Sequence, residues 1–223
     1  MYPKTRLRRL RHDILRPIFT ETRLSPEAFC LPLFFDEAAE EEIPISSMPG
    51  QVRYPLSAAG KLARELFAEG VRSVVLFGIP KEKDAAASQA FARDGVIQKA
   101  VSAMKAAEPK LVVITDLCAC EYTSHGHCGI IKETCGGFEL DNDASLVLMQ
   151  KIAVSQAEAG ADMVAPSCML DGMVERMEEE LGAKTTVVLT GGIAKFVQPL
   201  CKREMIYDKD LLIKGLATLY REN

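Results

Sequence analysis

Short, continuous apolar runs recur along the chain, each followed by a stretch with helical periodicity, and this alternation limits the fold more than any other feature. The runs that we interpret as strands are 31–35, 73–77, 111–115, 163–165 and 186–189. The segments that we interpret as helices are 57–69, 85–107 with an interruption near Gly95, 143–159 capped by Asp143, 173–181 and about 209–220. Strands that are apolar throughout and separated by helices are typical of a parallel sheet covered on both faces.

This pattern predicts an α/β fold. A (β/α)8 barrel and an open doubly wound sheet both fit the alternation. A complete barrel needs eight βα units and typically about 250 residues, whereas the chain has 223 residues and about five recognisable units. We therefore expect parallel βα units of the TIM (β/α)8 barrel type that form an incomplete barrel of about five strands.

Composition narrows the classes of function. Hydrophobic residues make up 48% of the chain and the net charge is -4, as in a soluble globular protein without a general affinity for nucleic acid or membranes. No apolar run approaches the roughly 20 residues that span a bilayer, and no apolar stretch follows the basic N-terminus as in a secretory signal. The basic cluster within residues 4–16 is interpreted as a solvated arm rather than a polyanion-binding arm. We expect a cytoplasmic protein whose seven cysteines are metal ligands, reactive thiols or core residues rather than disulfides.

The segment that carries chemistry follows the third predicted strand directly. Asp116, Cys118 and Cys120 alternate in sequence, so in extended backbone their side chains point to the same side. They stand at the C-terminal end of a parallel strand, where active sites of barrels and open α/β sheets lie. Cys128 can fold back across the loop as a third thiolate.

Three thiolates form a soft, anionic ligand set that suits Zn2+. Three protein ligands leave a fourth position for water or substrate, which is the pattern of catalytic rather than structural zinc. The spacing Cys-x-Cys-x7-Cys is not a common zinc-finger pattern, so a redox or incidental thiol cluster is an equal alternative. His125, His127 and Cys135 are possible fourth ligands that would close the site.

Other residues near this segment also have plain structural interpretations. Asp116 and Ser167 could each cap a turn, and the two histidines flank a glycine in what reads as a surface loop. Three further cysteines stand in apolar surroundings and are interpreted as small core residues: Cys30, Cys168 and Cys201.

Residues 116–129, DLCACEYTSHGHCG, resemble the metal-binding segment of zinc-dependent porphobilinogen synthases (5-aminolevulinate dehydratases). Other segments agree with this family in order, and the resemblance covers roughly residues 3–175. They include RLRRL at 6–10, LPLF at 31–34, MPG at 48–50, DND at 141–143 and ADMVAPS at 161–167.

The resemblance implies a (β/α)8 barrel whose N-terminal arm embraces a neighbouring subunit, usually in a homo-octamer. It implies a lyase that condenses two molecules of 5-aminolevulinate into porphobilinogen, a precursor of tetrapyrroles such as haem. By the same resemblance, Cys118, Cys120 and Cys128 hold the catalytic Zn2+, and Asp116 and Ser167 line a substrate site.

The family chemistry also uses two lysines that form Schiff bases with the substrates, in segments like SYSAKFAS and MVKP. Neither segment occurs in this sequence. Lys195 falls near the first position, but residues 189–194 before it do not match, and we interpret the likeness as coincidence. No catalytic lysine is assigned, and turnover by this chain alone is predicted to be absent or very weak. A catalytically inactive zinc-binding fragment or fusion is the alternative.

The end of the chain is similar to another family. Residues 187–194, with the turn TGG, and parts of 208–221 resemble the C-terminal end of type III pantothenate kinases. The phosphate-binding half of such kinases has no counterpart here, so kinase activity is not implied. The sequence therefore predicts an N-terminal arm at 1–28, a partial barrel at 29–175 and a divergent tail at 176–223 with a strand and a helix.

Overall fold

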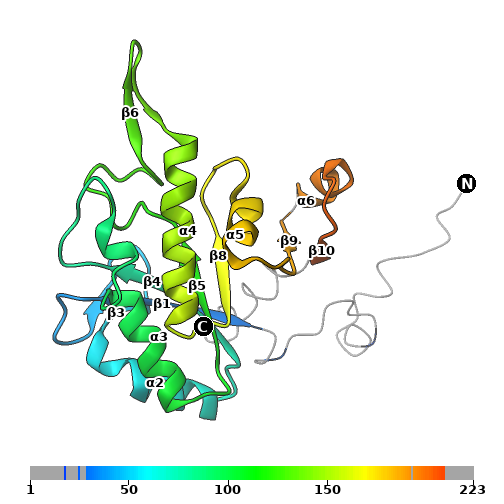
Figure 1. Ribbon diagram of the computed structural model, residues 1–223. Helices are drawn as coiled ribbons and strands as arrows, with labels where there is room; N and C mark the ends of the chain where they lie inside the picture. Colours follow the sequence, from blue (N-terminus) through cyan, green and yellow to red (C-terminus); the bar gives the residue numbers. More distant parts are fainter. Residues whose placement is uncertain (1–17, 19–24, 26–28, 192, 209–223) are drawn as a thin grey trace, which may run out of the picture. The chain divides into compact units, whose positions relative to one another are not determined.

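The computed structural model describes residues 18, 25, 29–191 and 193–208, which fall into two compact units (Figure 1). Residues 29–186 form the larger unit, and the described residues from 187 onward belong to the other. The predicted boundary at residue 176 therefore lies within the larger unit. The predicted N-terminal arm and the predicted helix at 209–220 lie outside the described residues, apart from Ile18 and Ser25 of the arm.

A six-stranded sheet forms the centre of the larger unit. Its order is β2-β3-β1-β4-β5-β8. All neighbouring strands run parallel except β2 and β3, which pair antiparallel. The strands are β1 (Cys30–Asp36), β2 (Ile43–Pro44), β3 (Val52–Pro55), β4 (Ser73–Ile79), β5 (Val112–Leu117) and β8 (Met163–Pro166). The four apolar runs predicted within this unit are thus confirmed as parallel strands, while the short and more polar β2 and β3 were not predicted.

Three helices cover one face of this sheet and lie side by side (Figure 1). They are α2 (Ala59–Ala68), which continues the short 3-10 helix η3 (Leu56–Ala58), α3 (Val96–Ala107) and α4 (Asn142–Glu158), and α5 (Met173–Leu181) packs against α4. Along β4, Val74 and Leu76 are fully buried, whereas the intervening Val75 and Phe77 are only half-buried. The apolar core therefore lies between the helices and one side of the sheet.

Two predicted helix starts are wrong, and an aspartate explains each. The helix predicted from residue 85 begins only at Val96, because the Asp84 carboxylate accepts hydrogen bonds from the backbone N–H groups of Ala86 (2.9 Å) and Ser88 (3.0 Å). That turn leads into a short 3-10 helix, η4 (Ser88–Ala90). The N-cap of α4 is Asp141 rather than Asp143: its side chain accepts from the backbone N–H of Ala144 at 3.1 Å.

Two further pairs of strands complete the described chain. Residues 117–140, in which neither a helix nor a strand was predicted, contain an antiparallel hairpin, β6 (Ile131–Thr134) and β7 (Gly137–Leu140). The hairpin projects beyond the start of α4 (Figure 1). In the smaller unit, β9 (Val188–Thr190) pairs in parallel with β10 (Ile206–Asp208). Between them lie α6 (Ala194–Val197) and the 3-10 helix η5 (Gln198–Leu200). Among the described residues, no helix is both long and apolar enough to cross a membrane.

Candidate metal centre

The predicted site residues gather where β5 and β8 end side by side. The two strands are parallel and in register, with Asp116 opposite Ala165 and Leu117 opposite Pro166. The residues that follow each strand therefore leave the sheet at the same edge, the carboxyl edge at which α/β proteins place their ligands. This register brings Ser167 next to Asp116 although 50 residues separate them in sequence.

Three thiols meet just beyond the end of β5. The sulfur atoms of Cys118, Cys120 and Cys128 all lie within 4.8 Å of one another, as expected from the sequence. The Sγ atoms of Cys118 and Cys120 are 3.0 Å apart. Cys118 is buried, and the other two are half-buried. Such an arrangement can hold a metal ion with limited access from solvent.

A tight turn returns the chain so that Cys128 can join the other two thiols. The backbone N–H groups of Tyr122 and Thr123 both donate to the carbonyl of Ala119 at 2.9 Å. The hydroxyl of Thr123 then donates to the carbonyl of His127 at 2.8 Å. Tyr122 and Thr123 are buried, so this turn is anchored in the core. The loop around the thiols is thus fixed by its own hydrogen bonds rather than by a metal alone.

Asp116 lies against the thiol cluster and is bonded to Ser167. Burial raises the pKa of the Asp116 carboxyl to about 6, and the hydrogen bond from the Ser167 side chain partly offsets this increase. The nearby negative charges of Glu121 and Cys118 raise the pKa further. A carboxyl group with a pKa in this range can exchange a proton near neutral pH.

Negative charge in the metal-free cluster is concentrated on Cys118. A hydrogen bond from the Cys168 thiol lowers the pKa of Cys118 to about 5, with a further contribution from Cys120. Burial raises the pKa of Cys120 and of Cys128 above the usual thiol value. One thiolate is therefore surrounded by protonated thiols, and a bound cation would replace those protons.

Sequence reasoning missed three residues of this site. Glu121 forms a second possible ligand group with Asp116 and Cys118, whose ligand atoms lie within 4.8 Å of one another. Cys168, predicted to be a small core residue, is half-buried and packs against the core, and its thiol also lies beside that of Cys118. Gln156 of α4 is buried and donates to the backbone carbonyl of Asp116 at 3.0 Å. Cys168 and Gln156 reach the site through contacts between distant segments, which no local motif reveals. Glu121 lies within the loop itself, directly after Cys120, and this adjacency was a signal that could have found it.

The other candidates from the sequence do not join the thiol group. The rings of His125 and His127 lie 5.5 Å apart, and His125 Nδ1 accepts from the backbone N–H of His127. Cys135 is exposed at the β6–β7 turn. Cys30 is half-buried, but Cys201 is exposed, so its prediction as a core residue is wrong.

Lys195 lies in α6, in the smaller unit. Its side chain is exposed, and its Nζ atom sits 4.8 Å from the ring centroid of Phe196. A lysine that forms Schiff bases is usually desolvated or close to another cation. Exposure therefore agrees with the interpretation that this residue is not a catalytic amine.

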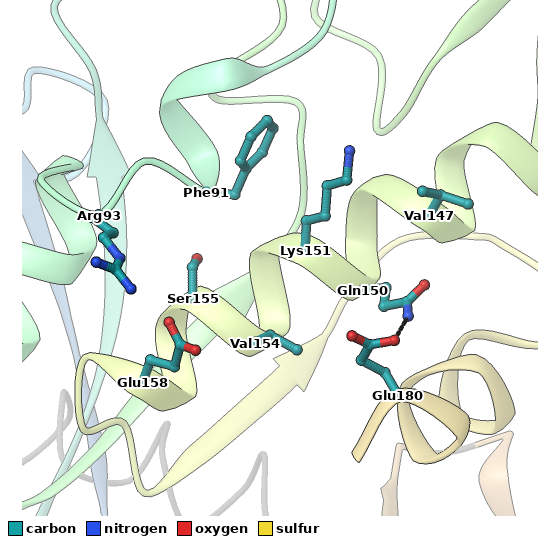
Figure 2. Close-up of a pocket in the computed structure, with 9 residues that line it drawn as sticks. All are labelled: Phe91, Arg93, Val147, Gln150, Lys151, Val154, Ser155, Glu158 and Glu180. Atoms are coloured by element: carbon teal, nitrogen blue, oxygen red, sulfur yellow. Dashed lines mark hydrogen bonds between the residues drawn. The ribbon is translucent and has the colours of Figure 1, made fainter. Parts of the chain in front are cut away.

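A shallow pocket of about 400 Å³ lies elsewhere on the larger unit, over α4 (Figure 2). Its charged lining is mixed: Arg93 and Lys151 are basic, and Glu158 and Glu180 are acidic. The Gln150 side-chain amide donates a hydrogen bond to the Glu180 carboxylate (Figure 2). None of the five predicted site residues lines this pocket, so it is separate from the thiol cluster.

The donor set at the end of β5 fits a soft divalent cation. Among the common divalent ions, Zn2+ is the one that thiolate sulfur suits as a ligand. Three mutually adjacent thiols can lose their protons when it binds. Magnesium and calcium prefer oxygen ligands, and the cluster offers mainly sulfur. The residues present therefore fit zinc.

Comparison with known proteins identifies the family. A family model described as delta-aminolevulinic acid dehydratase matches residues 4–196. The delta-aminolevulinic acid dehydratase of Archaeoglobus fulgidus is 50% identical over 182 residues, which cover 82% of this chain and 55% of the relative. That of Bacillus subtilis is 45% identical over 177 residues, covering 79% of this chain and 53% of the relative.

A solved structure agrees in fold. The chain is similar to delta-aminolevulinic acid dehydratase (porphobilinogen synthase) from Toxoplasma gondii in complex with the reaction product porphobilinogen, with a TM-score of 0.73 and 33% identity. The match covers 81% of this chain and 51% of that one. The parallel sheet of the larger unit is accordingly part of a TIM-type barrel, as the sequence predicts.

Two features of these matches bear on the chain's organisation. The chain spans about half the length of these relatives. The family match extends to residue 196, past the predicted limit at 175, and it includes Lys195. The resemblance of the tail to pantothenate kinases finds no support in any of the comparisons. Because the family model matches most of the sequence, the chain belongs to the delta-aminolevulinic acid dehydratase family.

Proposed function

We propose that this chain acts in porphobilinogen synthesis, as the zinc-binding part of a porphobilinogen synthase that condenses two molecules of 5-aminolevulinate. The observation that carries this proposal is the group of Cys118, Cys120 and Cys128 at the carboxyl edge of a partial barrel. Membership of the family supplies the substrate class. Because free thiolates persist in a reducing compartment, the site suits the cytoplasm.

In this proposal the three cysteines hold Zn2+, which polarises a carbonyl group of the substrate when bound. Asp116 and Ser167 lie beside the thiols and form a hydrogen-bonded pair. They are placed to orient the polar end of a small keto acid, and the Asp116 carboxyl can hold or release a proton near neutral pH.

Chemical trapping at Lys195 tests whether this chain can form a Schiff base with the substrate. We expect sodium borohydride, added with 5-aminolevulinate, to leave Lys195 unmodified, because the amine is exposed rather than desolvated. Mass spectrometry of peptides from the treated chain measures the modification. Lys184, also exposed, serves as a control for non-specific labelling.

The same experiment is paired with an assay for porphobilinogen. Turnover by this chain alone is expected to be absent or very weak and unchanged by Lys195→Ala. If the wild type forms porphobilinogen and Lys195→Ala does not, Lys195 is the catalytic amine and the interpretation of its surroundings is wrong.

We also propose that the chain associates with further copies of itself, as the family's octamers do. β8 is the last strand in the order of the described sheet, and such edges offer unpaired N–H and C=O groups. Apolar side chains near it are exposed, with Met163 at 54% and Met169 at 93%. Exposed apolar surface of this kind favours association.

Sedimentation velocity at several concentrations measures this association. We expect species larger than one chain, and a mean mass that rises with concentration. A single species near 24.4 kDa, the mass of one chain, at every concentration would show that the chain is a stable monomer.

A further inference from the structure

Tyr122 lies in the tight turn of the metal loop, which we define as residues 118–128, and its side chain reaches back to β4. The residue is only 5% exposed. A Cβ atom on Gly78, near the end of β4, would lie 2.5 Å from the Tyr122 hydroxyl oxygen, which is closer than non-bonded atoms pack. The absence of a side chain at Gly78 therefore leaves the space that the end of the Tyr122 side chain occupies.

The first turn of α3 forms the other wall of this space. A Cβ atom on Gly78 would also lie 2.8 Å from Cγ1 of Val96 and 2.7 Å from Cγ1 of Ile97, and both of these residues are buried. We call the space bounded by Gly78, Val96 and Ile97 the socket. Because protein cores are densely packed, the socket cannot accept an added methyl group unless Tyr122 or α3 moves.

Backbone contacts hold the same part of the metal loop against the connection between β4 and α3. Thr123 pairs with Asp84 in an isolated parallel bridge. The backbone N–H of Ser124 donates to the backbone carbonyl of Asp84 at 3.0 Å. The turn that contains Tyr122 is thus supported by residues 80–95 as well as by the end of β5.

The far end of the metal loop has a separate support on α4. Gly129 follows Cys128 directly, and a Cβ atom on this glycine would lie 2.6 Å from the Cβ atom of Ser145. The Ser145 hydroxyl also accepts a hydrogen bond from the backbone N–H of Ile130 at 2.9 Å. Cys128 is therefore placed by α4, whatever the position of Tyr122.

We propose that Tyr122 is a positioning residue of the metal centre, which sets the Cys120 sulfur at the correct distance from the sulfurs of Cys118 and Cys128. Cys118 directly follows β5, and Cys128 is placed by α4. Cys120 lies between these two supports and two residues before Tyr122. Its position therefore depends on how Tyr122 sits in the socket. This inference rests on the metal centre of the proposed function and leaves the fourth position of the metal open.

Gly78→Ala fills the socket and is expected to weaken zinc binding roughly 10- to 100-fold, as is typical when the support of a metal ligand is lost. With cobalt in place of zinc, the thiolate-to-metal charge-transfer absorption should also fall, because one sulfur is displaced. Competition with a chromophoric chelator measures the affinity. Leu66→Ala on α2 is the control: it removes packing against the core outside the socket, and should lower stability while leaving both metal measurements unchanged.

A double-mutant cycle shows whether Gly78→Ala acts through Cys120. In a chain that already carries Cys120→Ser, Gly78→Ala is expected to change the zinc affinity by less than about threefold, because the sulfur that it displaces is gone. In a chain that carries Cys128→Ser, the same substitution should keep its full effect. A general loss of structure would instead weaken binding equally in both backgrounds.

Tyr122→Leu tests the same contact from the other side. Leucine keeps an apolar side chain at this position but is too short to fill the socket, so zinc affinity and cobalt absorption should fall as they do in Gly78→Ala. Circular dichroism of the metal-free chains checks that each variant is folded. If Gly78→Ala does not fold, Tyr122→Leu replaces it in the cycle with Cys120→Ser and Cys128→Ser.

The outcomes separate this inference from the proposed function. Wild-type zinc affinity and cobalt absorption in a folded Gly78→Ala or Tyr122→Leu chain would overturn the inference and leave the three-cysteine centre intact. Equal losses of affinity in the two cysteine backgrounds would do the same. A wild-type chain that binds no zinc at all would overturn the proposed function as well.

Discussion

A chain carrying Cys118→Ser is expected to bind zinc roughly 100-fold more weakly than the wild type, and so are chains carrying Cys120→Ser or Cys128→Ser. The free energy of zinc binding to small Cys/His sites is about 10–16 kcal/mol shared among four ligands, so each ligand accounts for roughly 3 kcal/mol. A serine hydroxyl is a poor replacement because it stays protonated and is a harder donor. Competition with a chromophoric zinc chelator at constant pH measures the affinity.

Cys135→Ser is the matched control, because this thiol is exposed on the same loop region and lies outside the cluster. Its zinc affinity should equal that of the wild type. The combined replacement of Cys118, Cys120 and Cys128 should remove specific binding altogether. Unchanged zinc content in that triple variant would mean that the metal lies elsewhere in the chain.

Replacing Gln156 by alanine is expected to lower the free energy of unfolding by about 2–6 kcal/mol, because two buried polar groups lose their partner and each costs about 1–3 kcal/mol when unpaired. The side chain of Gln156 is 1% exposed. Its Oε1 atom accepts from the hydroxyl of Thr115 at 2.9 Å, and its Nε2 atom donates to the carbonyl of Asp116 at 3.0 Å. Equilibrium unfolding in urea, without metal, measures the effect.

The same substitution should also weaken zinc binding by about 10- to 100-fold, as is typical when a group that orients metal ligands is removed. Gln156 holds the end of β5, which contains Asp116 and is followed directly by Cys118. Gln150→Ala on the same helix is the control, since its side chain bonds to the exposed Glu180 at the surface. If Gln156→Ala and Gln150→Ala lower the free energy of unfolding equally, the buried hydrogen bonds of Gln156 do not stabilise the site.

The parallel strands could be predicted from the sequence because each is an apolar run too short for a helix. Leu31–Phe35, Ser73–Phe77 and Leu111–Thr115 are of this kind, and each forms a strand within one or two residues of the predicted ends. The cluster of Cys118, Cys120 and Cys128 could also be predicted, since its members lie within one loop. A short separation in sequence limits how far apart such side chains can lie.

Features that depend on distant contacts could not be predicted. Cys168 lies near the site only because β5 and β8 pair with Leu117 opposite Pro166. No pattern in the sequence predicts that register. The helix starts were misplaced because Asp84 and Asp141 compete for backbone N–H groups through their side chains. The β6–β7 hairpin was missed because its strands are short and largely polar or exposed.

Titration of 5-aminolevulinate into the chain by calorimetry tests most directly the claim that this site is the metal centre of a porphobilinogen synthase. Zinc-loaded protein is expected to bind the compound saturably. Metal-free protein and the zinc-loaded Asp116→Ala variant are expected to bind it at least about 10-fold more weakly, the order of effect produced by one charge-assisted hydrogen bond. Equal binding by all three samples, or no binding by the zinc-loaded wild type, would contradict the claim.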